Sequence, residues 1–505
     1  MKIRRYLYEL VALSAVLIAS LRIISTFKTL SSTTDEPAHL AAGLEYLATG
    51  AYTYEDQHPP LARMVGAAWL RLAGVPFGHY PDMYVEGDRL LGYRGHYWRN
   101  LFFSRLAMLP FFWIAAFVVF RWSRRIATPR AAALAVLVLT TIPPILGHAG
   151  LVTTDMAVAG LTWAALLAAV ELTEKPTLAG SLALGLCIGL AVLSKFSALV
   201  FFPVAGIAIA LCRYNDLRHL RKVVRYFPVI TIVVALSIWA CYSFSFGRVE
   251  YLHMKLPAPA FFSGIRSVWL HNEGGQISFL LGKLRPGGFW YYYPVVIFYK
   301  TPIGLMIIVI WGAFRRDCRR HCVMLAIALA VILTAMPGHI NIGVRHVLLV
   351  YLPLATFAGI VCDRVLSDGH LATIGCMVVL ITWCTVSVLH VHPDYISYMN
   401  ELAGQHPENI LADSDLDWEQ GYSRLNKRLQ QLGVQHFTFN PNTAGYMIAG
   451  NPFPPYEYMT AGRTPPHGWS AVAITPWRLF GRPEWPARYK PREVVAHSIL
   501  LYWFP

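Results

Sequence analysis

Two aspartates lie where an apolar run meets a polar segment, and both are suited to acid–base chemistry. Asp35 follows the first apolar run of the chain, and Asp155 precedes a later one. A carboxylate held between lipid and water is able to remove a proton from an acceptor nucleophile. A helix N-cap is the structural alternative, because Pro37 suits a first helical turn and Thr34 and Thr154 directly precede the aspartates. The two roles are compatible, and two acids on one membrane face favour a function.

Basic side chains are expected on the same face as these acids. Lys195, Lys300 and Arg345 lie beside apolar runs and apart from the arginine-rich clusters of the chain. His58 starts a rigid His-Pro-Pro turn, where it either has a structural role or binds an anionic group. A long basic side chain that snorkels to the interface needs no function. Three cations facing the same side as two carboxylates instead suggest an anionic lipid head group.

Membrane-spanning helices are the elements that must position these residues. A bilayer core about 30 Å thick needs about 20 apolar residues per helix, and about eleven segments are candidates. They lie near 8–28, 101–121, 131–147, 156–172, 178–194, 196–212, 227–246, 292–312, 322–337, 345–362 and 371–390. We interpret the first as a retained span, since Arg22 and Lys28 fit a signal-peptide cleavage site poorly.

The composition agrees with a chain whose solvent is mostly lipid. Of its 505 residues, 56% are hydrophobic and 14% are charged, whereas soluble domains carry about 25% charged residues. The net charge of +15 does not indicate a nucleic-acid partner, because most Lys and Arg lie in short clusters between apolar runs. The fold class is therefore that of an α-helical polytopic membrane protein.

The basic clusters predict the orientation of the chain. They are Arg121, Arg124, Arg125 and Arg130; Arg213, Arg218, Arg221, Lys222 and Arg225; and Arg315, Arg316, Arg319 and Arg320. With the N-terminus in the cytoplasm, all three clusters fall inside, as the positive-inside rule requires. The odd number of spans then leaves the C-terminus outside. Three long polar segments face outward, at about 29–100, 247–291 and 391–505, and the stretch 61–72 of the first is amphipathic enough to lie along the interface.

The last polar segment is expected to form a small extracytoplasmic α/β domain. The periodicity predicts a helix from Trp418 to Leu432 that ends at Gly433. Strand-like runs follow at His436–Asn440, Ala471–Thr475 and Val494–Trp503.

Two patterns are superficially like metal sites. Cys318 and Cys322 have the spacing of half a site, but no partner pair follows them. Asp413, Asp415 and Asp417 alternate as in a calcium loop, yet the glycine and the distal glutamate of such a loop are missing. We interpret the aspartates as a helix cap before Trp418.

Several motifs together resemble a known family. They are Asp35-Glu36, His58-Pro59-Pro60-Leu61, Thr154-Asp155, Leu193-Ser194-Lys195-Phe196, Lys300-Thr301-Pro302, Arg345-His346, the run from His392 to Gly404, and Asp413 to Trp418. In order and spacing the chain resembles, nearly end to end, the GT-C superfamily of membrane glycosyltransferases. The likeness is to glycosyltransferase family 39, bacterial relatives of protein O-mannosyltransferases and of the lipid A aminoarabinose transferase.

The resemblance implies an enzyme that moves a sugar from a polyprenyl-phosphate donor to an acceptor, with inversion, outside the membrane. Asp35 matches the catalytic base and Glu36 its neighbour. Asp155 matches a second-loop acid that shapes the site or contacts acceptor or metal. Lys195 and Arg345 match cations that face the donor phosphate.

Two further residues complete the expected donor-phosphate site, Lys300 and His58. Aminoarabinose transferases have a lysine before the Pro-Pro where this chain has His58. That departure leaves the phosphate contact at this position, and the identity of the sugar, open.

The implied organisation is a GT-C-like catalytic domain over residues 1–390 and an α/β domain over residues 391–505. The expected partners are the lipid bilayer, a polyprenyl-phosphate-linked sugar, and a glycan, lipid or protein acceptor, in a bacterial inner membrane. No obligatory cofactor is expected, because fixed cations are able to stabilise a departing phosphate. A divalent cation held by Asp35, Glu36 and Asp155 is the alternative.

A transporter or flippase of lipid-linked sugars is the alternative function. Transporters tend to show inverted repeats and charges near the bilayer midplane. Here no internal repeat is visible, and the candidate charges are expected at one membrane face. The enzyme is therefore favoured.

Overall fold

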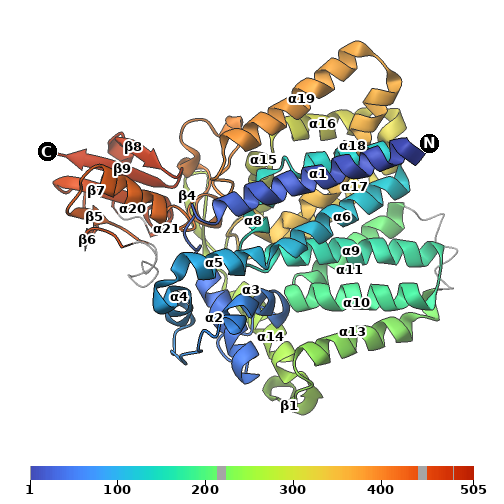
Figure 1. The fold of residues 1–505 in the computed structure, drawn as a ribbon, viewed down its shortest axis with the longest axis horizontal. Coiled ribbons are helices and arrows are strands. Elements are labelled where there is room, and N and C mark those ends of the chain that lie inside the picture. The colour runs from blue at the N-terminus through green and yellow to red at the C-terminus, as the bar shows by residue number, and fades with distance from the viewer. Residues whose placement is uncertain (1, 213–222, 442–451, 481–482) are drawn as a thin grey trace.

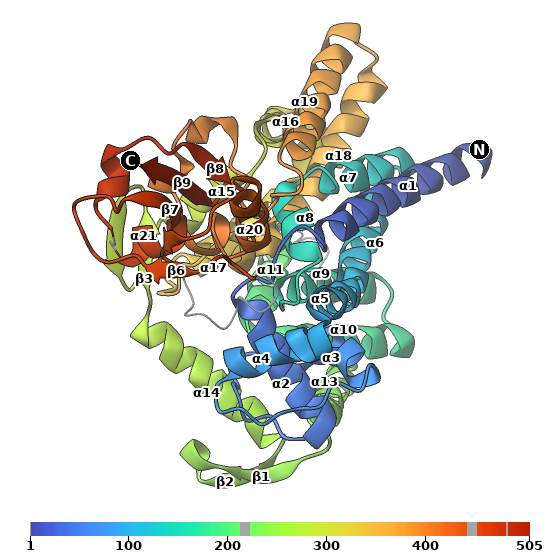
Figure 2. The ribbon, with the colours of Figure 1, turned by 60° about the vertical axis from the view of Figure 1, so that its left-hand side comes forward.

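The structure is a computed structural model that describes residues 2–212, 223–441, 452–480 and 483–505. A bundle of helices makes up most of it, and a small sheet lies at the end opposite the N-terminus (Figure 1). Turned by 60°, the molecule shows α14 (Pro259–Gly274) and the β1–β2 hairpin (Phe246–Val249 and Met254–Pro257) reaching away from the bundle (Figure 2). The expected class, a helical membrane protein with a small α/β part, is confirmed.

Within the described residues, five helices are long and apolar enough to cross a membrane, or up to seven if each bent pair is one span. The five are α1 (Lys2–Thr26), α5–α6 (Tyr97–Leu106 and Leu109–Ile126), α9 (Asp155–Glu174), η5–α18 (Val344–Val350 and Tyr351–Asp368) and α19 (Leu371–His390). Shorter apolar helices are α10 (Leu178–Ser194), α11 (Ala198–Cys212), α13 (Phe227–Cys241) and α17 (Val323–Ala335). Every expected apolar segment thus contains a helix, and the number of spans stays a prediction.

Two expected spans are bent, and prolines account for both bends. The segment 131–147 divides into α7 (Pro129–Leu139) and α8 (Pro143–Ala149), which meet at 72°. The segment 292–312 divides at Pro302 into α15 (Tyr292–Lys300) and α16 (Ile303–Phe314), which meet at 110°. Proline has no backbone N–H and its ring clashes with the preceding turn, so a helix cannot continue straight through it.

Three helices of the first polar segment pack tightly against one another. They are α2 (Asp35–Thr49), α3 (Pro60–Leu72) and α4 (Met83–Gly92). A Cβ added at Gly43 of α2 would come within 2.3 Å of the Arg63 carbonyl oxygen, and one at Gly87 of α4 within 2.0 Å of the Pro37 carbonyl oxygen. Glycine is therefore needed at both crossings. The amphipathic stretch 61–72 forms α3, and its position at a membrane interface stays a prediction.

Asp88 of α4 is a buried acid within this packed group. It is 5% exposed, and its Oδ1 has no hydrogen-bond partner among the described residues. Burial raises the pKa of Asp88 from 3.8 to about 7. The Asp88 carboxyl therefore binds its proton more tightly in the folded protein than in the unfolded chain. As the pH rises from about 4 to about 7, the loss of this proton lowers the free energy of unfolding.

We expect Asp88→Asn to raise the melting temperature by a few degrees at pH 8 and to leave it nearly unchanged at pH 4. The substitution removes the cost of burying a charge, which is present only above the raised pKa. Thermal unfolding followed by tryptophan fluorescence measures the difference. Asp82→Asn, which changes an exposed cap of the same helix, should show no such pH-dependent gain. An equal gain at both pH values would contradict the explanation.

The C-terminal sheet has five described strands in the order β6-β5-β7-β9-β8. They are β5 (Phe437–Phe439), β6 (Tyr456–Tyr458), β7 (Gly468–Ala473), β8 (Glu493–Val495) and β9 (Ile499–Phe504). Strand β5 is parallel to β6 and β7, whereas β9 is antiparallel to β7 and β8. The expected strand 494–503 is thus a hairpin, because Ala496 and His497 adopt positive φ angles between β8 and β9.

The helix expected from Trp418 begins later, as α20 (Tyr422–Gln431). The residues before it bind the chain between α1 and α2 instead: the Ser31 amide donates to the Gln420 carbonyl (3.0 Å) and the Thr34 amide to the Trp418 carbonyl (3.2 Å). Tyr395 still belongs to the main hydrophobic core. A division of the chain near residue 390 stays a prediction.

Candidate active site

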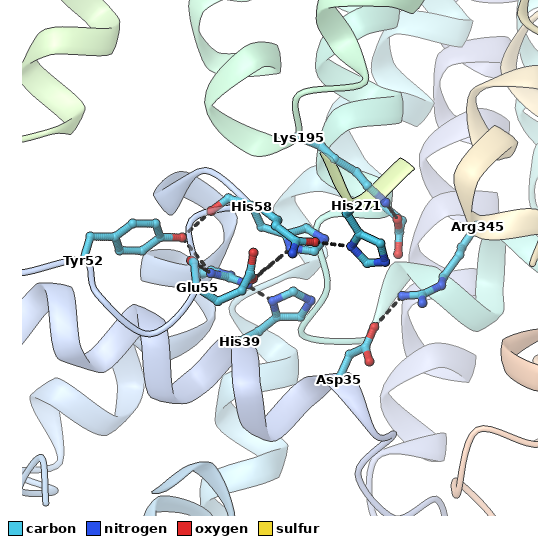
Figure 3. Close-up of polar contacts among 11 residues, drawn as sticks. Asp35, His39, Tyr52, Glu55, His58, Lys195, His271 and Arg345 are labelled. Atoms are coloured by element: carbon cyan, nitrogen blue, oxygen red, sulfur yellow. Dashed lines mark hydrogen bonds and ion pairs between the residues drawn. The ribbon is translucent and has the colours of Figure 1, made fainter. Parts of the chain in front are cut away.

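Asp35 and Arg345 form an ion pair near the end of the bundle that carries the sheet (Figure 3). Asp35 is the first residue of α2, and Arg345 lies in η5, just before α18. Nη1 of Arg345 is 2.6 Å from Oδ2 of Asp35, and the two side chains are 8% and 26% exposed. The guanidinium also lies over the ring of Trp418, 4.2 Å from its centroid. Nε of Arg345 has no hydrogen-bond partner among the described residues.

A second ion pair, between Asp155 and Lys195, belongs to the same group of charges. Asp155 is the first residue of α9, and Lys195 follows the last residue of α10. Nζ of Lys195 is 2.7 Å from Oδ1 of Asp155, while the buried Oδ2 has no hydrogen-bond partner among the described residues. Arg345 interacts electrostatically with both Asp35 and Asp155. The structure therefore brings together two acids and two cations that are far apart in the sequence.

Asp35 and Asp155 are not the N-cap residues of their helices. Thr34 and Thr154 occupy the N-cap positions, and neither side chain accepts a capping hydrogen bond. The carboxylates of Asp35 and Asp155 instead face cations, at helix N-termini whose partial positive charge stabilises an anion.

Glu36, which was expected to contribute to catalysis beside Asp35, contacts protein groups in the structure. Its carboxylate is fully buried and receives two hydrogen bonds from Arg105, at 2.8 and 2.7 Å. It also accepts from the backbone amides of Thr33 (2.8 Å) and Val152 (3.0 Å). Glu36 therefore ties the start of α2 to α5 and to the loop that precedes Asp155. Both of its oxygens already have protein partners, and a catalytic role for Glu36 stays a prediction.

Lys300, which was expected to contact the donor phosphate, contacts backbone carbonyl groups in the structure. It is 1% exposed, and Nζ donates to the carbonyl oxygens of Ile396 (2.6 Å) and Asp415. Asp415 in turn accepts from the Val344 amide (2.9 Å). Lys300 therefore fastens the bent pair α15–α16 to the C-terminal segment and is occupied by protein groups.

His58 lies in a polar network rather than standing as a fixed cation. Its Nδ1 is 3.0 Å from Oε2 of Glu55, which forms an ion pair with Arg63. Arg63 also donates from Nε to Nδ1 of His39 (2.9 Å). Burial lowers the pKa of His58 although Glu55 opposes the shift, and burial together with Arg63 lowers the pKa of His39. Both imidazoles are therefore neutral near pH 7.

Asp413, Asp415 and Asp417 neither cap α20 nor converge on a metal. Asp413 to Asp415 form a single 3-10 turn, and Asp417 accepts from the Thr475 amide (3.0 Å). Burial raises the pKa of Asp413 to about 7, although the nearby Arg345 opposes the shift. Across the described ranges, no group of three or more His, Cys, Asp or Glu side chains is arranged to hold a metal ion.

The divalent cation considered on Asp35, Glu36 and Asp155 does not fit their arrangement here. Asp35 and Asp155 face Arg345 and Lys195, and Glu36 is held by Arg105 on another side of α2. The three carboxylates thus do not form one shared set of oxygen ligands.

Sequence reasoning missed the part of Arg63 in the His58 network and the packing of Trp418 on Arg345. Arg63 was counted as part of an amphipathic stretch, and its spacing from Glu55 and His58 within one turn-and-helix unit was the available signal. The contact between Trp418 and Arg345 joins distant parts of the chain, and no local pattern indicates it.

Comparisons with known proteins found one matching family model and several similar solved structures. Residues 93–242 match the sequence model of a family described as dolichyl-phosphate-mannose-protein mannosyltransferase. The crystal structure of ArnT from Cupriavidus metallidurans in the apo state is similar at 13% identity and a TM-score of 0.52, over 97% of both chains. Over nearly its whole length the chain therefore has the fold of this ArnT.

The structure of the same ArnT bound to undecaprenyl phosphate matches equally, at 14% identity, a TM-score of 0.52 and 97% of both chains. Among curated proteins, no sequence is similar enough to match. The fold expected from the resemblance is thus confirmed, and the glycosyltransferase activity stays a proposal. The matched family segment contains Asp155 and Lys195 but not Asp35 or Arg345, so the roles of individual residues stay proposals.

Proposed function

We propose that this GT-C protein transfers a sugar from a polyprenyl-phosphate donor to an acceptor on the extracytoplasmic side of the membrane, with inversion at the anomeric carbon. The observation that carries the proposal is the adjacency of the Asp35–Arg345 and Asp155–Lys195 pairs at one end of the bundle. Such a site offers one base and two cations, the groups that an inverting transfer from a lipid phosphate requires. The undecaprenyl phosphate bound to the similar ArnT supports this donor class.

In the proposed reaction, Asp35 takes the proton of the acceptor's nucleophilic atom. That atom bonds to the anomeric carbon from the face opposite the phosphate, and the bond between this carbon and the phosphate oxygen breaks. The electron pair stays on the departing phosphate, where Arg345 and Lys195 stabilise the charge. No covalent enzyme intermediate is needed, because the base and the leaving group lie on opposite faces of the sugar.

The ion pair between Asp35 and Arg345 connects donor binding to activation of the base. A guanidinium binds phosphate oxygens through two parallel hydrogen bonds, and Nε of Arg345 has no partner among the described residues. A donor phosphate that engages Arg345 would replace Asp35, whose carboxylate would then turn to the acceptor. Arg345 thereby keeps the base occupied until the donor is bound.

The remaining residues support this centre in the proposal. Asp155 orients Lys195, and the His58 network fixes the outer loop beside the site. Arg345 and Lys195 supply the positive charge, so transfer should persist in EDTA, whereas loss of transfer would favour a divalent cation. The acceptor is a glycan, lipid or protein.

The proposed location is a bacterial inner membrane, with the N-terminus in the cytoplasm and the C-terminal α/β part outside. Arg125, Arg319 and Arg320 line one pocket near the end of α9 that is opposite Asp155, as expected if these clusters are cytoplasmic. Of the second basic cluster, Arg213, Arg218, Arg221 and Lys222 lie outside the described residues.

We expect Arg345→Gln to lower kcat/KM for sugar transfer by about a hundredfold, because one donor to the departing phosphate is lost. Proteoliposomes supplied with labelled polyprenyl-phosphate sugars and an acceptor extract provide the measurement. Arg428→Gln is the matched control, since it breaks a half-exposed ion pair with Glu493 in the C-terminal part and should leave the rate unchanged. A wild-type rate for Arg345→Gln would refute its role. Movement of labelled lipid across the bilayer without any transfer would favour a transporter.

A further inference from the structure

A pocket lined in part by arginines lies near the opposite end of α9 from Asp155. It is a cavity of about 660 Å³ between the C-terminal ends of α6 and α9, the end of α11, and η4–α17 (η4, Arg316–His321). Helix α9 runs from Asp155 at the candidate active site to Glu174 at this pocket. Its 20 residues span about 30 Å, so the two sites are separate.

The pocket carries an excess of positive charge. Arg125, Arg319 and Arg320 line it, and Glu174 is its one lining acid. Arg125 already forms an ion pair with Glu174. Neither Arg319 nor Arg320 has a carboxylate within ion-pair distance in the part of the chain that the structure describes. Two guanidinium groups are thus available to an anion.

His321 lies beside the same group of arginines. It is 4% exposed and accepts a hydrogen bond at Nε2 from Nε of Arg320 (2.9 Å). Burial and the neighbouring Arg320 and Arg364 lower the pKa of His321 to about 4. The imidazole is therefore neutral near pH 7, and it adds no charge that would offset or repel an anion at the two arginines.

The other walls are apolar. Trp122 and Met324 are buried, and Ile209 and Val323 also line the cavity. Helices α9, α11 and α17, which border the pocket, are among the apolar helices of the bundle. A cytoplasmic orientation would explain why arginines lie at this end, but it does not require them to line a pocket whose other walls are apolar. An amphiphile with an anionic head matches both kinds of wall.

We propose that this pocket binds the phosphate-bearing head group of an anionic phospholipid, held by Arg319 and Arg320, with its acyl chains along α11 and α17. The guanidinium groups contact phosphate oxygens, and Trp122 and Met324 pack against the glycerol and the first methylenes. The inference is independent of the proposed transferase reaction.

Native mass spectrometry of the full chain, released from nanodiscs of phosphatidylglycerol and phosphatidylcholine, tests the proposal. We expect phosphatidylglycerol to be retained about tenfold more than phosphatidylcholine, and this preference to disappear in Arg319→Gln/Arg320→Gln. Arg316→Gln is the matched control, because Arg316 is an exposed arginine of the same η4 that does not line the pocket. It should keep the preference.

Three outcomes would overturn the proposal. Equal loss of preference in Arg316→Gln would show a diffuse surface charge effect instead of a pocket. Displacement of the lipid by millimolar inorganic phosphate would identify a site for free phosphate. An unchanged preference in the double variant, with an unchanged melting temperature, would show that Arg319 and Arg320 do not bind the head group.

Discussion

Asp35→Asn is expected to lower the rate of sugar transfer about a thousandfold, because a positioned general base contributes on this order to proton transfer. Asparagine keeps the size of the side chain and its ability to accept hydrogen bonds, but it cannot take the acceptor's proton. The measurement is kcat in proteoliposomes with labelled polyprenyl-phosphate sugar. KM for the donor should change little or fall, because Arg345 loses its charged competitor for the phosphate.

Asp82→Asn provides the matched control for this experiment. Asp82 is an aspartate of the same polar segment, and it caps α4 by accepting hydrogen bonds from the amides of Tyr84 and Val85. Its substitution should leave kcat unchanged. If Asp35→Asn transfers sugar at the wild-type rate while its melting temperature is preserved, Asp35 is only a partner of Arg345, and another group must be the base.

The helices and the grouping of charges could be predicted from the sequence because both follow from the thickness of the membrane. A segment long enough to cross places its two ends on opposite faces. The four charged residues of the candidate site lie at ends of apolar segments on the same predicted face; they are Asp35, Asp155, Lys195 and Arg345. In a compact bundle such residues come close to one another. The ion pairs between them confirm that approach.

The direction of each side chain could not be predicted in the same way. Glu36 follows Asp35 directly, yet successive residues of a helix point about 100° apart, which turns Glu36 toward Arg105. Lys300 ends α15 before a bend of 110° that directs it to Ile396 and Asp415. Which neighbour meets each of these side chains depends on helix crossings that no local pattern encodes.

In the C-terminal segment, too, contacts between distant parts of the chain could not be predicted from the local sequence. Its strands were predictable from alternating apolar residues, but residues 418–421 looked helical because their pattern continues that of α20. In the structure their carbonyl groups bind the amides of Ser31 and Thr34, and Trp418 covers Arg345. Tertiary contacts to the chain just before Asp35 override the local helical preference.

Glu36→Gln is expected to destabilise the fold by about 3–5 kcal/mol, because Arg105 would remain buried without its counter-charge. Arg105 is 1% exposed, and its other hydrogen bonds go to the carbonyl oxygens of Leu30 and Ser31. Thermal unfolding in detergent measures the loss. Glu250→Gln, which removes an 80% exposed carboxylate 3.6 Å from Arg248, should leave the melting temperature unchanged.

The double variant Glu36→Gln/Arg105→Gln separates a positioning role from a catalytic one. Neutralising both partners removes the unpaired buried charge, so part of the lost stability should return. If Glu36 only positions Asp35, kcat per folded molecule should recover together with stability and stay far above that of Asp35→Asn. If stability recovers while kcat stays as low as in Asp35→Asn, the carboxylate of Glu36 takes part in the reaction despite its burial. The hydrogen bonds from Arg105, Thr33 and Val152 favour the first outcome, because they leave Glu36 no oxygen for the acceptor.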